Sequence, residues 1–211
     1  MMESLSRICA VSLILGLFSI SASGLAATAT ITANELNKVF QPIKENDWAK
    51  VEQAAFQLIN RQSPGQRYMI ARLRYIYFIS LAIQLENNKL TVAQLKDKLK
   101  VLEEKLIIQP WHPVKAKASP CFNKICASED NPAVLVTTQA NDKATQIYSF
   151  EYFDTGAPID ISSFDGAHAR LGGILHKIEI NPNLFKKLNS NTEVAWYLRL
   201  RFRDGFIQYN R

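Results

Sequence analysis

The chain has little of what enzyme active sites are usually built from. It contains three histidines and three cysteines among its 211 residues. It lacks the serine-hydrolase pattern G-x-S-x-G, the zinc-protease pattern H-E-x-x-H, a Walker phosphate loop and the dinucleotide-binding pattern G-x-G-x-x-G. These absences favour a protein that is not an enzyme and that uses no cofactor.

Long basic runs and long apolar runs are also missing. No block of five or more Lys or Arg residues occurs, so the net charge of +6 is dispersed. Such an excess favours anionic partners in general and specifies none. The apolar run at residues 8–20 is too short for a membrane-crossing helix, which needs ~20 residues.

The N-terminal residues have the pattern of a secretory signal peptide, and they resemble the leaders of exported bacterial proteins. Arg7 precedes the apolar run, and small residues follow it at 21–29. Cleavage after Ala26 places Gly24 at the third position before the cut, as the small-x-small rule requires. We therefore expect residues 1–26 to be removed from a periplasmic or secreted protein without a membrane span. An uncleaved membrane anchor is the alternative.

Two cysteines remain after this cleavage. In the oxidising compartment that export implies, Cys121 and Cys126 are predicted to form a disulfide. A redox pair is one alternative, but such pairs usually have two intervening residues, and here there are four. The second alternative is that the two cysteines supply two ligands of a metal ion, but no cluster of His or Cys supplies the missing ligands. No metal site is therefore predicted.

Residues 27–109 are predicted to form a helical domain of about four helices. The central helix is expected over residues 63–88, with Ser63 as N-cap and Pro64 at the first helical position. Between residues 75 and 85 nearly every side chain is apolar, so this helix needs neighbours on all sides.

The other predicted helices begin at capping residues. The capping patterns are Thr32 with Glu35, Asp47 alone, and Thr91 with Gln94. The last helix is expected to cover residues 91–107. Because the loops are short, the helices are predicted to pack as antiparallel hairpins. This arrangement resembles tetratricopeptide-type repeats, although no 34-residue internal repeat is present.

The composition changes after residue 109. Residues 110–132 contain four prolines and both cysteines, and we expect a linker there. In residues 133–211 apolar and polar side chains alternate with a period of two, which predicts a small antiparallel β domain. Within it, Gly172-Gly173 predicts a bulge or sharp bend, and Asp204-Gly205 predicts a hairpin turn. This part resembles an oligonucleotide/oligosaccharide-binding (OB) barrel in strand count and glycine bend, so an α+β fold is expected.

The last alternating segment, residues 193–203, carries the strongest candidate site. Its outward residues are expected to be Tyr197, Arg199, Arg201 and Arg203. Three guanidiniums beside a tyrosine suit a polyanion: a polysaccharide, a lipid headgroup or a nucleic acid. Export argues against nucleic acid. The interpretation favoured over binding is a solvated face whose arginines pair with Glu151 or Glu179 on neighbouring strands.

The histidines are weaker candidates. His168 lies three residues after Asp165, and together with Asp160 this pair would suit a hydrolase, although the spacing also arises by chance. His176 is expected to point inward as a hydrogen-bonded core residue, and His112 to be an ordered part of the linker. No catalytic residue is assigned.

These patterns predict an exported, non-catalytic binding or interaction protein of the cell envelope. Its partner is expected to be a protein held in a groove between helices. An anionic ligand bound by the arginines of an OB-like barrel is the first alternative. Hydrolysis by Asp165 and His168 is the second.

Overall fold

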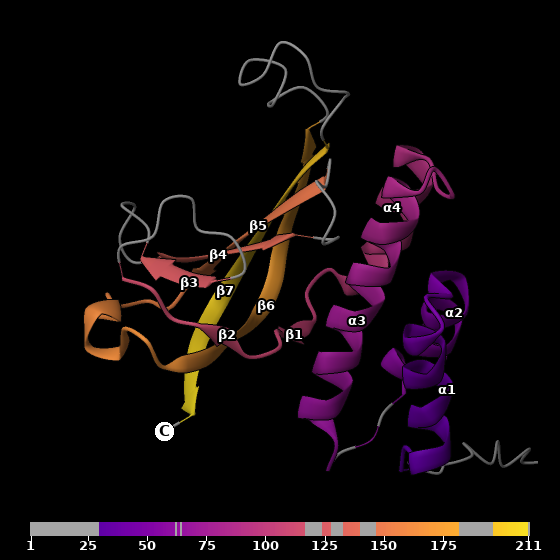
Figure 1. Ribbon diagram of the computed structural model, residues 1–211, viewed down its shortest axis with the longest axis horizontal. Helices are drawn as coiled ribbons and strands as arrows, with labels where there is room; N and C mark the ends of the chain where they lie inside the picture. Colours follow the sequence, from indigo (N-terminus) through magenta and orange to yellow (C-terminus); the bar gives the residue numbers. More distant parts are fainter. Residues whose placement is uncertain are drawn as a thin grey trace, which may run out of the picture.

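The computed structural model of the protein describes residues 30–61, 63, 65–116, 124–127, 133–139, 147–181 and 196–210. The helices are α1 (Ala33–Lys44), α2 (Trp48–Ile59), α3 (Arg67–Glu86) and α4 (Val92–Leu99), with short 3-10 helices η1 (Lys100–Leu102) and η2 (Ile161–Phe164). The strands are β1 (Leu106–Ile108), β2 (His112–Pro113), β3 (Lys124–Ala127), β4 (Ala133–Gln139), β5 (Ile147–Asp154), β6 (His168–Asn181) and β7 (Trp196–Asn210). The predicted α+β class is confirmed (Figure 1). None of the described helices is long and apolar enough to cross a membrane.

Three helices begin at their predicted caps. At α1, the backbone N–H of Glu35 donates to the Thr32 hydroxyl at 3.3 Å, and the Glu35 carboxylate accepts from the Thr32 backbone at 2.9 Å. The same reciprocal box is present at the start of α4. Asp47 caps α2 by accepting from the backbone of Lys50 at 3.2 Å. Each cap satisfies a backbone donor that the first helical turn leaves without a partner.

The predicted start of the central helix is wrong. α3 begins at Arg67, and the residue before it, Gln66, makes no side-chain cap. The Gln66 side chain instead bonds to both backbone groups of Ile31, accepting at 2.6 Å and donating at 3.1 Å. The backbone of Gln66 also donates to Ser63 O at 2.9 Å, which closes a turn before the helix.

The last helix is shorter than predicted, and the expected linker contributes strands. α4 ends at Leu99, and β1 begins at Leu106, inside the region predicted to be helical. The backbone of β1 pairs with β6, and this pairing satisfies groups that a longer helix would have bonded internally. β2 and β3 both lie within residues 110–132, so this stretch is part of the sheet.

The strands form one curled sheet in the order β1-β6-β7-β5-β4-β3, and β2 also pairs with β6. The sheet is mixed, because β5 and β7 run parallel where an antiparallel sheet was predicted. Its two edges meet where Val114, next to β2, bridges Ile125 of β3. The backbone of Lys115 adds a hydrogen bond of 3.0 Å to Ile125 O. The sheet therefore curls back on itself.

β7 is one continuous strand, so the predicted hairpin turn at Asp204-Gly205 is wrong. β7 has one more residue than β6 between the pairs Ile174↔Arg203 and Gly172↔Phe206, and Asp204 has a positive φ of 51°. The Asp-Gly pair therefore forms a bulge. Gly172-Gly173 lies opposite this bulge, where the pairing of β6 with β7 shifts register, but the extra residue belongs to β7 and not to β6 as predicted.

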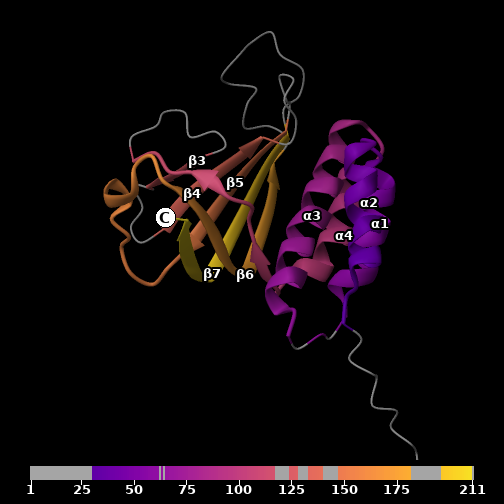
Figure 2. The same ribbon diagram turned by 60° about the horizontal axis from the view of Figure 1, so that its bottom comes forward.

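α3 lies between the sheet and the α1–α2 hairpin in both views of the ribbon (Figure 1, Figure 2). Buried side chains of α3 and of the sheet belong to one hydrophobic cluster. Members from α3 include Tyr77, Phe78 and Leu81, and members from the sheet include Phe153, Leu200 and Phe202. The helix that is apolar on nearly every face is thus the central element, as predicted.

Candidate functional site

The predicted row of Arg199, Arg201 and Arg203, called here the arginine row, faces outward as expected. Leu198, Leu200 and Phe202 are buried, and the alternate residues Arg201 and Arg203 are exposed while Arg199 is half-buried. The structure describes only the backbone of Tyr197, so the predicted outward orientation of its side chain stays a prediction.

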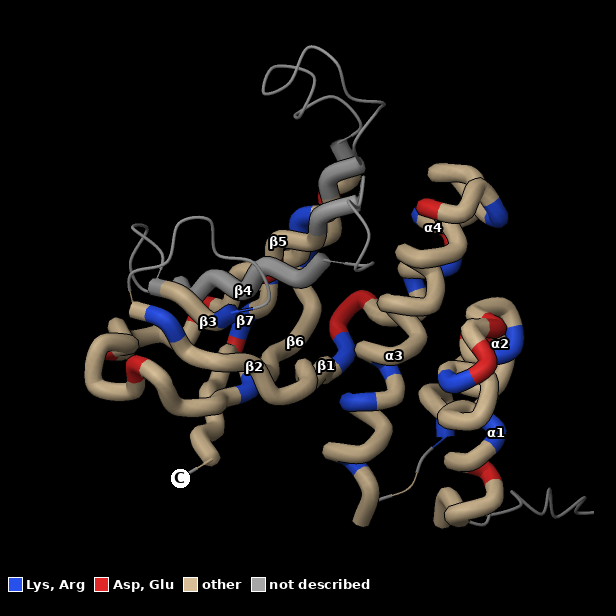
Figure 3. Tube along the Cα trace, viewed as in Figure 1, with Lys and Arg blue, Asp and Glu red and all other residues tan. Residues whose placement is uncertain are grey.

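Figure 3 marks the basic and acidic positions along the Cα trace. Arg199 and Arg203 of this row each have an acidic partner. Arg203 pairs with Glu104 at 2.7 Å and with Asp204 at 2.6 Å, and its guanidinium holds the pKa of Glu104 below the usual value. Arg199 lies 3.5 Å from Glu179, as the solvated-face interpretation predicts. Glu151, the other predicted partner, is fully buried and makes its hydrogen bonds elsewhere.

The hydrolase candidates are not assembled into a catalytic group. Asp165 pairs with Lys115 at 3.8 Å and accepts from the backbone of Ala116 at 3.0 Å. Asp160 caps η2, and hydrogen bonds from Ser162 and Ser163 lower its pKa. His168 is exposed, and within the described ranges no hydrogen bond joins it to either aspartate.

The prediction that His176 points inward is wrong. His176 is exposed and lies 3.5 Å from Glu104, because β6 has an extra residue between the pairs Leu175↔Phe202 and Lys177↔Arg201. This bulge shifts the alternation and turns His176 outward. His112, expected in the linker, is buried in β2.

The predicted disulfide involves Cys121, which lies outside the described residues. Cys126 is buried in β3. The pairing of the two stays a prediction. Among the described residues, no group of three or more His, Cys, Asp or Glu side chains is arranged to hold a metal ion.

An apolar cavity of about 380 Å³ lies beside α3. One wall is a stripe of α3 residues at helical spacing: Arg72, Tyr75, Ile76 and Ile79. The other walls come from α1, the start of α2, β1, the β1–β2 connection and β6: Phe40, Ile43, Trp48, Ile108, Gln109, Pro110, Trp111 and Arg170. The cavity therefore joins the helical part to the sheet.

Aromatic and basic side chains form the outer edge of the cavity. Phe40 and Trp111 are 42% and 41% exposed, so the cavity reaches the surface. The Arg170 guanidinium lies over the Trp111 ring at 4.7 Å, and its Nε donates to Gln208 at 2.8 Å. Arg72 is exposed on the same edge.

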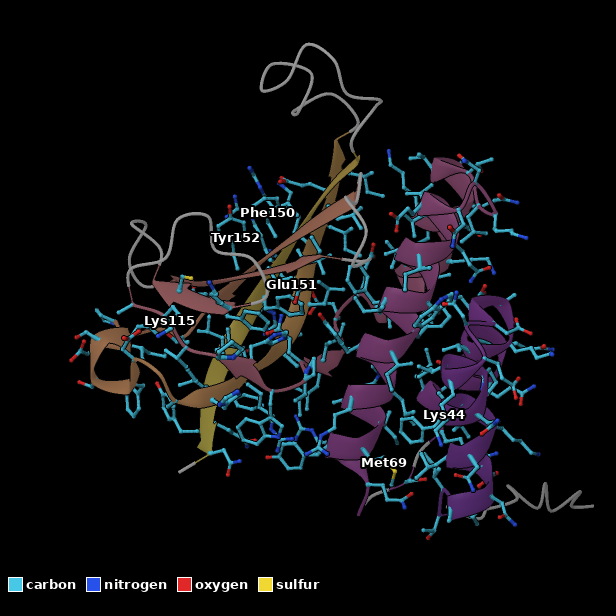
Figure 4. The ribbon with its side chains drawn as sticks, in the orientation of Figure 1. Lys44, Met69, Lys115, Phe150, Glu151 and Tyr152 are labelled. Atoms are coloured by element: carbon cyan, nitrogen blue, oxygen red, sulfur yellow. The ribbon has the colours of Figure 1, made fainter. Side chains whose placement is uncertain are left out.

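Behind the cavity, two of its lining residues bond to the buried Glu151. Gln109 donates its Nε2 to one carboxylate oxygen, and the Tyr75 hydroxyl lies 3.5 Å from the other. Ser149 donates to the carboxylate at 3.1 Å. Figure 4 shows Glu151 on one side of β5 and its neighbours Phe150 and Tyr152 on the other. Neither this network nor the cavity was predicted from the sequence.

The comparisons with known proteins give no relative. No protein-family model, curated protein or solved structure matches the chain.

Proposed function

We propose that the chain is an exported, non-catalytic binding protein of the cell envelope, and that it holds a small apolar ligand in the cavity beside α3. One observation carries the proposal: a surface-reaching, mainly apolar hollow of about 380 Å³. Sites for small molecules typically have volumes of ~300–1,000 Å³ and apolar or aromatic walls. The proposed site thus replaces the arginine row as the leading candidate.

The walls of the cavity are held in place by polar contacts. Arg74 donates to Leu106 O at 3.0 Å and to Ile59 O at 3.3 Å, which ties α3 to β1 and α2. Tyr75 and Gln109 are tied to Glu151. Protein interiors are normally close-packed, because a void loses attractive contacts. Walls fixed in this way keep the void open, and a bound ligand would supply the missing contacts.

The other candidate functions have less support. A polyanion would have to compete with carboxylates for Arg199 and Arg203. A hydrolase would need Asp165 released from Lys115 and Ala116. The proposal that the protein is exported rests on the sequence pattern of residues 1–26, which lie outside the described residues.

Binding of the neutral fluorescent probe N-phenylnaphthylamine tests the proposal. We expect saturable binding at one site per chain. Ile79→Trp, which fills the cavity, should weaken this binding by ~tenfold or more, about 1.4 kcal/mol. Phe56→Leu is the matched control, because Phe56 is 44% exposed and packs on Tyr77 away from the cavity. A probe that does not bind, or binds Ile79→Trp as tightly as the wild type, would overturn the proposal.

A further inference from the structure

Two arginines stand at the edge of the apolar cavity, and neither has an acidic partner in the part of the chain that the structure describes. Arg72 comes from α3, and Arg170 comes from β6. Arg170 bonds to the neutral side chain of Gln208 and lies over Trp111. No ion pair within the described ranges of the chain involves either guanidinium.

Several other arginines of the fold do have strong partners. Arg61 pairs with Glu35 at 2.6 Å, and Arg203 pairs with Glu104 at 2.7 Å. Arg74 bonds to two backbone carbonyls. Arg72 and Arg170 differ from these in facing a hollow that contains no carboxylate.

The Arg72 guanidinium lies near enough to Arg170 for its positive charge to disfavour the charged form of Arg170. Partial burial lowers the pKa of Arg170, and the positive charge of Arg72 lowers it further. An anion between the two groups would relieve both effects. A carboxylate suits this position, since its two oxygens match the planar donor fork of a guanidinium.

We infer that the ligand of the cavity is an amphiphilic carboxylate, with its carboxylate at Arg72 and Arg170 and its hydrocarbon chain along Ile76 and Ile79. The inference rests on the proposed function, because it assigns a ligand class to the same cavity. Arg72 and Ile79 are seven residues apart on α3, which places them ~10 Å apart along the helix axis. The cavity therefore runs from a charged end to an apolar end, as a fatty acid does.

Displacement of N-phenylnaphthylamine by decanoate and by decanol tests this inference, with both compounds kept below the concentrations at which they aggregate. In the wild type, decanoate should displace the probe at a concentration ~tenfold lower than decanol, because a charge-assisted hydrogen bond adds to the shared apolar contacts. Arg72→Gln and the double variant with Arg170→Gln should lose this preference while decanol binds unchanged. Arg201→Gln is the matched control, because it removes the same charge from an exposed residue outside the cavity.

The outcomes separate the two proposals. If neither compound displaces the probe and the probe itself does not bind, the proposed function fails. If decanoate and decanol compete equally, or if Arg201→Gln abolishes the preference as fully as Arg72→Gln does, the carboxylate inference fails while the apolar site stands. Should Arg170→Gln unfold through loss of its Trp111 contact, Arg72→Gln alone decides the question, since Arg72 is exposed and supports no hydrogen bond within the described residues.

Discussion

The hydroxyl of Tyr75, on α3, lies 3.5 Å from Oε1 of Glu151, on β5. Gln109 bonds to the same carboxylate from the β1–β2 connection. Tyr75 and Gln109 both line the cavity, so one fully buried residue supports two of its walls. Buried polar groups are stable only when their hydrogen bonds are made, and this network couples the helices to the sheet.

Glu151→Ala should destabilise the protein by roughly 1–3 kcal/mol, because it leaves the donors of Gln109 and Ser149 buried without an acceptor. Glu151→Gln retains the shape and one acceptor oxygen and should cost less. Urea unfolding monitored by circular dichroism measures both. Glu179→Ala is the control, since its pairs with Lys177 and Arg199 lie on the outer face and such pairs contribute ~0–1 kcal/mol. If Glu151→Ala and Glu179→Ala lowered the free energy of unfolding equally, the role of Glu151 in coupling the helices to the sheet would be contradicted.

Gly172 lies where the ring of Phe206 occupies the space of a side chain. A Cβ at residue 172 would overlap the end of that ring and would also meet the side chain of Ile108. Gly172→Ala should therefore lower the free energy of unfolding by roughly 1–3 kcal/mol. The cost should fall in a Phe206→Ala background, and a double-mutant cycle of unfolding free energies measures the difference. An unchanged cost in that background would show that the ring is not the cause.

Glu35 is expected to titrate at about pH 2. The bond from Arg61 is the main cause, followed by those from Thr32, and together they lower the pKa of Glu35 from 4.5 to about 2. Because the folded-state pKa is depressed, the contribution of this carboxylate to stability is complete above about pH 4.5 and is lost as the pH falls toward 2. An NMR titration checks the pKa, and Arg61→Gln should raise it. Denaturant midpoints of Glu35→Gln should show less acid sensitivity in this window, whereas an unaltered profile would count against the pair.

The N-terminus of the protein recovered from the cell envelope should be Ala27. A Gly24→Arg variant should remain uncut, because signal peptidase sites need a small residue at that position. Intact-mass spectrometry distinguishes the cleaved chain from the full one. Wild-type protein that retains residues 1–26 would support the anchor alternative.

Features determined by neighbouring residues were predictable from the sequence. Thr32, Asp47 and Thr91 mark helix starts because their side chains accept hydrogen bonds from backbone groups three residues away. The alternation of buried and outward-facing side chains in β7 was predictable because successive side chains of a strand point to opposite faces.

Features determined by distant pairing were not predictable. Leu99, Leu102 and Leu106 fit one helical stripe, yet Leu106 pairs with Ile174 in the sheet. Asp204-Gly205 has the local chemistry of a turn, but β6 pairs with the chain on both sides of it. The cavity combines residues from α1, α2, α3, β1, the β1–β2 connection and β6, and no local pattern brings these together.

NMR of isoleucine methyl groups during a titration with decanoate tests the central claim most directly. Ile43, Ile76, Ile79 and Ile108 line the cavity, whereas Ile125 and Ile161 are buried elsewhere in the core. The account predicts saturable shifts of the four lining methyl groups, with those of Ile125 and Ile161 unchanged. Shifts confined to Ile125 and Ile161, or no shifts at saturating decanoate, would contradict it.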